Sequence, residues 1–176
     1  MIRLLALSGS LRAASSNAAL LGAAALLAPE GVAVEFYEDI GALPHFNPDL
    51  EADNLPGVVA AFRARIGATD GLLISCPEYA RGIPGSFKNA LDWLVGSFEF
   101  PGKPVALFNA SPRAADAQAA LRLVLQTMSA RLVEEAGLTL PLLAKGLDAF
   151  AIAADPDLAA SIKAALAALA AAIGPQ

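Results

Sequence analysis

Residues 9–17, Gly-Ser-Leu-Arg-Ala-Ala-Ser-Ser-Asn, combine a glycine, three hydroxyl groups and a guanidinium group just before an alanine- and leucine-rich run. Amides at the start of a helix attract an anion, serine hydroxyls donate to its oxygen atoms, and Arg12 can add a charged hydrogen bond. The segment therefore favours a phosphate group. A turn and helix cap beside a solvated arginine is the alternative, and the segment alone does not separate the two.

Two well-known glycine motifs are missing from this segment. It has neither the G-x-x-x-x-G-K-[ST] of nucleoside triphosphate sites nor the G-x-G-x-x-G of dinucleotide sites. Their absence favours a monophosphate over longer phosphate chains.

Residues 77–85, Pro-Glu-Tyr-Ala-Arg-Gly-Ile-Pro-Gly, contain two prolines and two glycines, so parts of this backbone are stiff and parts carry no side chain. Such a loop can lie close against a flat ligand, and Tyr79 offers it an aromatic face. An ordinary loop with a tyrosine anchored in the core is the alternative interpretation. A third polar segment, residues 109–116, follows another apolar run.

The elements that must position these segments alternate along the chain between short apolar runs and helical patterns. Apolar runs of strand length predict strands at 2–8, 32–37, 71–76 and 105–108, with a weaker fifth strand within 133–142. Apolar residues at helical spacing predict helices at 16–28, 55–66, 86–97, 115–132 and from the Asp155-Pro156-Asp157 cap to Gly174-Pro175.

This alternation predicts an α/β fold, a three-layer sandwich with helices on both faces of a five-stranded parallel sheet. We expect strand order 2-1-3-4-5 and one domain over residues 1–176. In such sheets, ligands bind at the carboxyl ends of the strands, where the strand order reverses between the first and third strands. The three polar segments would therefore meet at one edge of the sheet.

Charge and composition exclude several classes of partner. The net charge is −5 and no basic run exists, so we expect no nucleic-acid partner. No apolar run reaches roughly 18 residues, which argues against a membrane span. The amino-terminal run lacks the pattern of an export signal, and Cys76 is the single cysteine, so we expect a cytoplasmic protein without disulfide or structural zinc. His45 and Cys76 have no neighbours that would activate them, and we expect neither to be catalytic.

Four stretches of the chain resemble the NADPH-dependent FMN reductase family, which includes quinone, azo and chromate reductases of flavodoxin-like fold. They are GSLRAASSN at 9–17, PHFNPDL at 44–50, PEYARGIPGSFKNALDW at 77–93 and KPVALFNASP at 103–112. The resemblance runs through about three quarters of the chain, and the stretch at 77–93 is the most specific.

The resemblance implies a bound FMN and names the residues that contact it. Its phosphate would be held by Ser10, Arg12, Ser15, Ser16 and Asn17. Its ring site would be formed by Pro77, Glu78, Tyr79, Ala80, Arg81, Gly82 and Ser111. Two departures stand out: Ala80 replaces the asparagine of the PEYN form of the motif, and Arg113-Ala114-Ala115-Asp116 replaces glycines often seen after the SASP stretch.

The implied activity is transfer of hydride from NADPH or NADH through FMN to quinones or other small acceptors such as flavin, azo compounds or chromate. The flavin supplies the chemistry, so no catalytic side chain and no metal are expected. Because of their positive charge, Arg12, Arg81 and Arg113 are candidates to contact the 2′-phosphate of NADPH.

The resemblance also implies a homodimer or homotetramer formed through the helix at 86–97. Phe87, Trp93 and Phe98 are candidates for that interface, and core positions are the alternative for all three.

Two other function classes remain open at this point. One is a flavodoxin-type electron carrier without NAD(P)H activity. The other is a phosphate-binding regulatory domain without flavin.

Overall fold

A computed structural model describes residues 1–51 and 54–174 of the chain. Its strands are β1 (Ile2–Ser8), β2 (Val32–Phe36), β3 (Gly71–Ser75), β4 (Pro104–Asn109), β5 (Arg131–Leu132) and β6 (Leu138–Thr139). Its helices are α1 (Ser16–Leu26), α2 (Gly57–Gly67), α3 (Gly85–Val95), α4 (Ala115–Thr127), α5 (Ala149–Ala154) and α6 (Pro156–Ile173). Short 3-10 turns lie at Asp39–Ala42, Pro48–Leu50 and Glu134–Ala136.

The strands form a parallel sheet in the order β2-β1-β3-β4-β5, which confirms the predicted flavodoxin-like order. In its centre, Leu5 of β1 pairs with Glu35 of β2 on one side and Leu72 of β3 on the other. Side chains 4–7 of β1 are fully buried, because both faces of a parallel sheet are covered. Strand β2 lies at the edge and is half-buried along its whole length, as its mixed sequence predicts.

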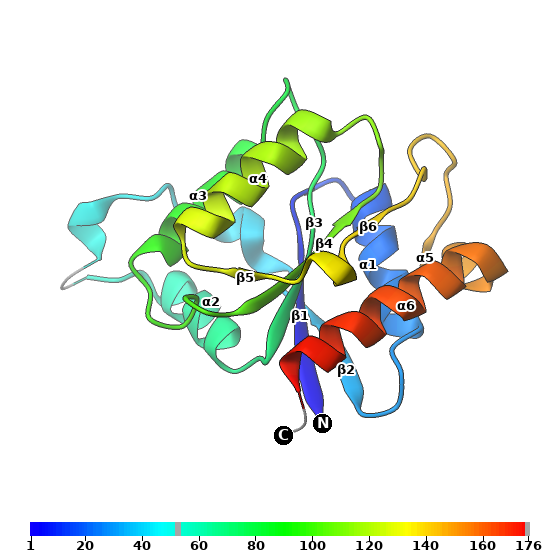
Figure 1. Cartoon of the computed structure of the whole chain (residues 1–176). Coiled ribbons are helices and arrows are strands. Elements are labelled where there is room, and N and C mark those ends of the chain that lie inside the picture. The colour runs from blue at the N-terminus through cyan, green and yellow to red at the C-terminus, as the bar shows by residue number, and fades with distance from the viewer. Residues whose placement is uncertain (52–53, 175–176) are drawn as a thin grey trace.

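Helices α1, α5 and α6 lie on one face of the sheet, and α2, α3 and α4 lie on the other (Figure 1). The α1 side is filled mostly by leucine and alanine, whereas the α3 side holds most of the buried aromatic residues among its aliphatic ones. All loops that follow the carboxyl ends of the central strands are therefore at one end of the molecule, at the top of Figure 1.

Local signals explain where several helices begin and end. The hydroxyl of Ser15 accepts a hydrogen bond from the Ala18 amide at the start of α1. Asp155 accepts from two amides of the first turn of α6, where Pro156 occupies the first helical position. Gly174, with φ of 85°, ends α6 in a conformation that favours glycine. Pro175, the other predicted end signal, lies outside the described residues.

The prediction for the region after β4 is wrong in three respects. Helix α4 ends at Thr127 instead of Leu132, because Ser129 has φ of 62° and the chain then turns back to pair with β4. The fifth strand is divided into β5 and β6, with a 3-10 turn between them, and both pieces pair with β4. The sequence analysis also missed α5, a helix of six residues capped by Asp148.

Helix α6 is apolar and long enough to cross a membrane by length and composition. Its bulky residues Ile162, Leu166 and Leu169 are fully buried against the sheet and the neighbouring helices. Alanines and the charged Lys163 occupy its outer face. In this fold, α6 covers the sheet.

The aromatic residues of α3 belong to the core. Phe87 and Trp93 are fully buried, and the indole Nε1 of Trp93 donates to the carbonyl oxygen of Pro44 at 2.7 Å. The side-chain amide of Asn89 donates to the same oxygen at 2.9 Å and accepts from the Phe46 amide at 2.7 Å. These bonds fix the loop before Pro48–Leu50 against α3. Phe98, by contrast, is 98% exposed.

Candidate functional site

A cavity of about 260 Å³ opens at the carboxyl ends of the central strands, where the first predicted helix also begins. Six of the predicted site residues line it together: Ser16, Asn17, Pro77, Glu78, Tyr79 and Ser111. Its remaining lining residues are Cys76, Asn109, Ala110, Arg113, Ala114 and Leu143. The loops after β1, β3 and β4 therefore meet at one edge of the sheet, as expected.

The start of α1 presents hydrogen-bond donors to this cavity. Among the described residues, the backbone amides of Ser16 and Asn17 have no acceptor. The buried side chain of Asn17 accepts from the hydroxyl of Ser75 at 2.8 Å, which leaves its Nδ2 group as a further donor. This bond also ties α1 to the end of β3. Free amides at a helix start, with the positive end of the helix dipole, suit an anionic ligand.

The other predicted phosphate residues border neighbouring hollows. Ser10 and Arg12 line one of about 480 Å³ beside the end of β2, and Ser15 lines another of about 320 Å³ toward residues 146–149. The hydroxyl of Ser10 accepts from the Arg12 amide at 3.3 Å. Arg12 is exposed, and no carboxylate of the described residues pairs with it. The five residues predicted to hold the phosphate thus all lie in or next to the loop after β1, and two of them, Ser16 and Asn17, line the main cavity.

The loop after β3 closes on itself as a tight hairpin. Tyr79 and Gly82 exchange backbone hydrogen bonds of 3.1 and 3.0 Å, and the two residues between them, Ala80 and Arg81, have φ of 50° and 62°. Positive φ at both central residues is typical of a two-residue type I′ turn, in which asparagine and glycine are favoured. The asparagine of the related motif would suit the position that Ala80 occupies.

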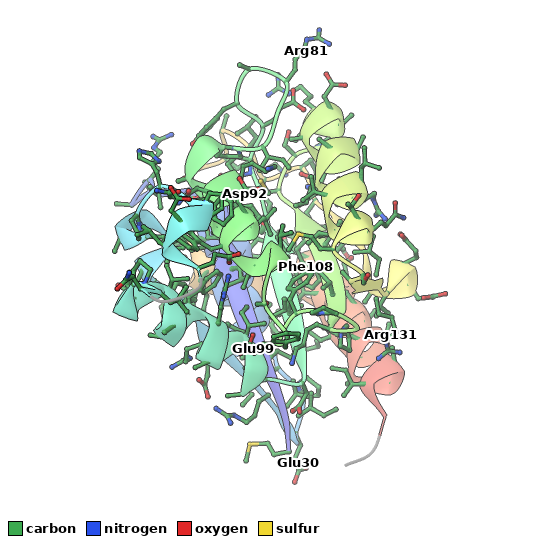
Figure 2. All side chains as sticks on the ribbon, turned by 90° about the vertical axis from the view of Figure 1, so that its left-hand side faces the viewer. Glu30, Arg81, Asp92, Glu99, Phe108 and Arg131 are labelled. Carbon is green, nitrogen blue, oxygen red and sulfur yellow. The ribbon has the colours of Figure 1, made fainter. Side chains whose placement is uncertain are left out.

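The tip of this hairpin does not reach the cavity. Ala80, Arg81 and Gly82 are absent from its lining, although all three were predicted to form the ring site. Figure 2 shows Arg81 at the extreme end of the molecule, opposite to Glu30. Its guanidinium group lies 3.1 Å from the carboxylate of Asp116, and both side chains are largely exposed.

Glu78 fastens this loop to the next helix. Its carboxylate oxygen Oε2 accepts a hydrogen bond of 3.0 Å from the amide of Ala117, in the first turn of α4. A negative charge at a helix amino terminus is stabilised by the helix dipole. The carboxylate therefore has a structural partner at one edge of the cavity.

The loop after β4 lies at this edge, as predicted for residues 109–116, and lines the cavity with more residues than Ser111. The side-chain oxygen of Asn109 accepts from the Ser111 amide at 3.0 Å, and the Ser111 hydroxyl accepts from the Arg113 amide at 3.2 Å. These local turns were detectable, because asparagine and serine after a strand favour such bonds. Leu143 gave no sequence signal, since it reaches the cavity from a loop that follows β6.

The floor of the cavity holds a buried, unactivated thiol. Cys76 is fully buried, and burial raises the pKa of its thiol to about 12. Gly9 lies directly against it, because a Cβ atom added at Gly9 would be 2.8 Å from the Cys76 sulfur. His45 is exposed on its loop. Within residues 1–51 and 54–174, no group of three or more His, Cys, Asp and Glu side chains could hold a metal ion.

Comparison with known proteins shows which family the chain belongs to. The family model for NADPH-dependent FMN reductase matches residues 2–142. An NAD(P)H-dependent FMN reductase of Pseudomonas aeruginosa is 43% identical over 112 residues, which cover 62% of this chain and 60% of that enzyme. A 2-hydroxy-1,4-benzoquinone reductase of a Burkholderia species is 45% identical over 106 residues, covering 58% and 57%. The matched stretches thus span less than two thirds of these curated relatives.

One solved structure aligns with nearly the whole length of this chain. The flavoenzyme NAD(P)H:(acceptor) oxidoreductase FerB of Paracoccus denitrificans aligns with a TM-score of 0.76 and 32% identity, over 96% of this chain and 97% of that protein. The family model, the sheet order and this alignment agree with one another. The chain belongs to the NADPH-dependent FMN reductase family.

Proposed function

We propose that this protein binds FMN in the cavity at the carboxyl end of the sheet and reduces quinones with NADPH or NADH. The observation that carries this proposal is the combination of free amides at the start of α1 with a mostly apolar wall from the loops after β3 and β4. One part suits a phosphate and the other suits a flat ring. Flavins, azo compounds and chromate are further acceptors to test.

The residues present fit FMN. The amides of Ser16 and Asn17 and the hydroxyl of Ser16 would hold the phosphate, and Ser10, Arg12 and Ser15 would support the same loop from outside the cavity. Pro77, Tyr79 and Ser111 would border the ring. Residues 80–82 would brace this wall from the hairpin, and Glu78 would fix it to α4.

When bound, FMN supplies two-electron transfer, so that NAD(P)H, a proton and a quinone become NAD(P)⁺ and a hydroquinone. The protein binds and orients the reactants, and its side chains need not act as acid, base or nucleophile. The high pKa of the Cys76 thiol keeps that group neutral at the floor of the site. Its lack of activation is consistent with positioning alone.

The cavity is also small for a complete ligand site, since such sites usually measure roughly 300–1,000 Å³. A second copy of the chain would enclose the ligand further, and we therefore propose a homodimer or homotetramer. The exposed side chains of Val95 and Phe98 at the end of α3 are the candidate contacts. We also propose that the chain acts as one domain in the cytoplasm, where its free Cys76 stays reduced.

The test is the visible spectrum of the purified protein during turnover. We expect the absorption bands of oxidised flavin, loss of these bands when NADPH or NADH is added without oxygen, and their return when 1,4-benzoquinone follows. Flavin that is bound but not bleached by either nucleotide would support an electron carrier. Failure to take up added FMN would refute the proposed cofactor.

A further inference from the structure

Arg113 is a lining residue of the cavity whose charge has no partner there. No carboxylate of the described residues lies within 4.0 Å of its guanidinium group, whereas Arg81 of the neighbouring loop is paired with Asp116. Building on the proposed function, we infer that Arg113 makes the enzyme prefer acceptors that carry a negative charge on a flat ring, such as quinone sulfonates and quinone carboxylates.

The backbone of Arg113 is held in place before any ligand binds. Its amide donates to the Ser111 hydroxyl, and the Ala114 amide donates to the Ser111 carbonyl oxygen at 3.1 Å. The bond from Ser111 to Asn109 anchors this turn to the end of β4. The backbone from which the exposed Arg113 side chain extends is therefore fixed at the cavity wall.

The other charge in the lining does not neutralise Arg113. The Glu78 carboxylate accepts from the Ala117 amide at the start of α4 and is not ion-paired with Arg113.

The rest of the wall near Arg113 is apolar and suits a ring. Ala110, Ala114 and Leu143 line the same cavity and are not among the residues assigned to the FMN ring. A planar guanidinium group can bind a sulfonate or carboxylate through two hydrogen bonds, while the apolar wall contacts the ring. An aromatic anion satisfies both parts of the site at once.

The test measures acceptor choice in the second half of the reaction alone. The FMN-loaded protein is reduced by light without oxygen and mixed with 1,4-naphthoquinone-2-sulfonate or with uncharged 1,4-naphthoquinone. Arg113→Gln should slow reoxidation of the reduced flavin by the sulfonate about 10-fold or more. It should slow reoxidation of the flavin by the neutral quinone less than about 2-fold. Arg113→Lys should restore part of the loss. Arg122→Gln, which removes the same charge from the outer part of α4, should change neither rate.

A binding measurement gives a second readout without turnover. Calorimetry on the oxidised, FMN-loaded protein should show that Arg113→Gln weakens binding of 2-naphthoate about 10-fold and leaves that of 2-naphthamide unchanged. Equal losses for the charged and neutral members of either pair, or no loss for either, would overturn the inference. If reoxidation of the flavin by the quinone sulfonate depends on Arg113 but neither NADPH nor NADH bleaches the flavin, the proposed function is refuted and this inference still stands.

Discussion

The loops that follow β1 and β3 meet at the same cavity but differ in what they present to it. The loop after β1 leaves the amides of Ser16 and Asn17 without acceptors among the described residues. The loop after β3 closes on itself: Tyr79 exchanges backbone hydrogen bonds with Gly82, and the Glu78 carboxylate accepts from the Ala117 amide at the start of α4. An anion needs free donors, whereas a flat ring needs a rigid wall. The contrast is consistent with a ligand that has a phosphate at one end and a ring at the other.

The largest effect should come from a negative charge placed in the loop after β1. Aspartate is a good helix cap, so Ser15→Asp keeps the bond to the Ala18 amide but repels a phosphate. We expect FMN to bind about 100-fold more weakly than to Ser15→Asn, its neutral counterpart of the same shape. Titration with flavin fluorescence measures both constants.

Riboflavin, which lacks the phosphate, is the control ligand for that pair. The two variants should bind it equally, because only the charge differs between them. Equal FMN affinities for Ser15→Asp and Ser15→Asn would show that this loop does not hold the phosphate. The contrast between the two loops would then lose its functional meaning.

A second prediction concerns Cys76, which lies between the two loops. Burial raises the pKa of its thiol from 9.0, the ordinary value of a cysteine, to about 12 in the fold. Between these values, the unfolded chain loses the proton that the folded chain keeps, so the free energy of unfolding falls as pH rises. The slope contributed by this thiol is at most about 1.4 kcal/mol per pH unit.

Urea unfolding of wild type and Cys76→Ala from pH 8 to 11 measures this slope. The variant should lose less stability above pH 9 than the wild type, whatever its absolute stability. If the free energy of unfolding falls equally with pH in both proteins, the Cys76 thiol is not shielded from water in the fold.

The smallest effect should come from the tip of the hairpin after β3. Ala80 has φ of 50°, a conformation that asparagine adopts more readily than alanine. Ala80→Asn should raise the free energy of unfolding by about 0.5–1 kcal/mol, seen as a higher midpoint of thermal unfolding. Ala80→Val, with a branched side chain in the same conformation, should lower it.

The same variant also tests the difference between the two loops. Since Ala80 does not line the cavity, Ala80→Asn should leave the dissociation constant of FMN unchanged. Tighter FMN binding would show instead that the asparagine of the related motif contacts the flavin directly.

Much of the fold was predictable because strong local signals coincide with it. The apolar runs of β1, β3 and β4 are long enough for buried strands, and their alternation with helices leaves few sheet orders. The caps at Ser15 and Asp155 also act within a few residues of the sequence. The sheet order was also enough to predict that residues 16–17, 77–79 and 111 meet at one cavity.

The region after α4 was harder because its local pattern points to the wrong structure. Leu125, Met128 and Leu132 continue a helical spacing beyond the true end of α4, and Leu132 is instead drawn into pairing with Val105. Two-residue strands such as β5 and β6 have almost no sequence pattern of their own. Pairing with an existing strand edge decides where they form.

Nearby residues and chain order were enough to define the central strands, the caps of α1 and α6, and the three loops that meet at the cavity. Contacts made in the folded chain were needed to pair Arg81 outside the cavity, to bring Arg113 to its lining and to complete the wall with Leu143. The two sets differ because the direction and partners of a side chain depend on the shape of its loop and on residues far away in the sequence.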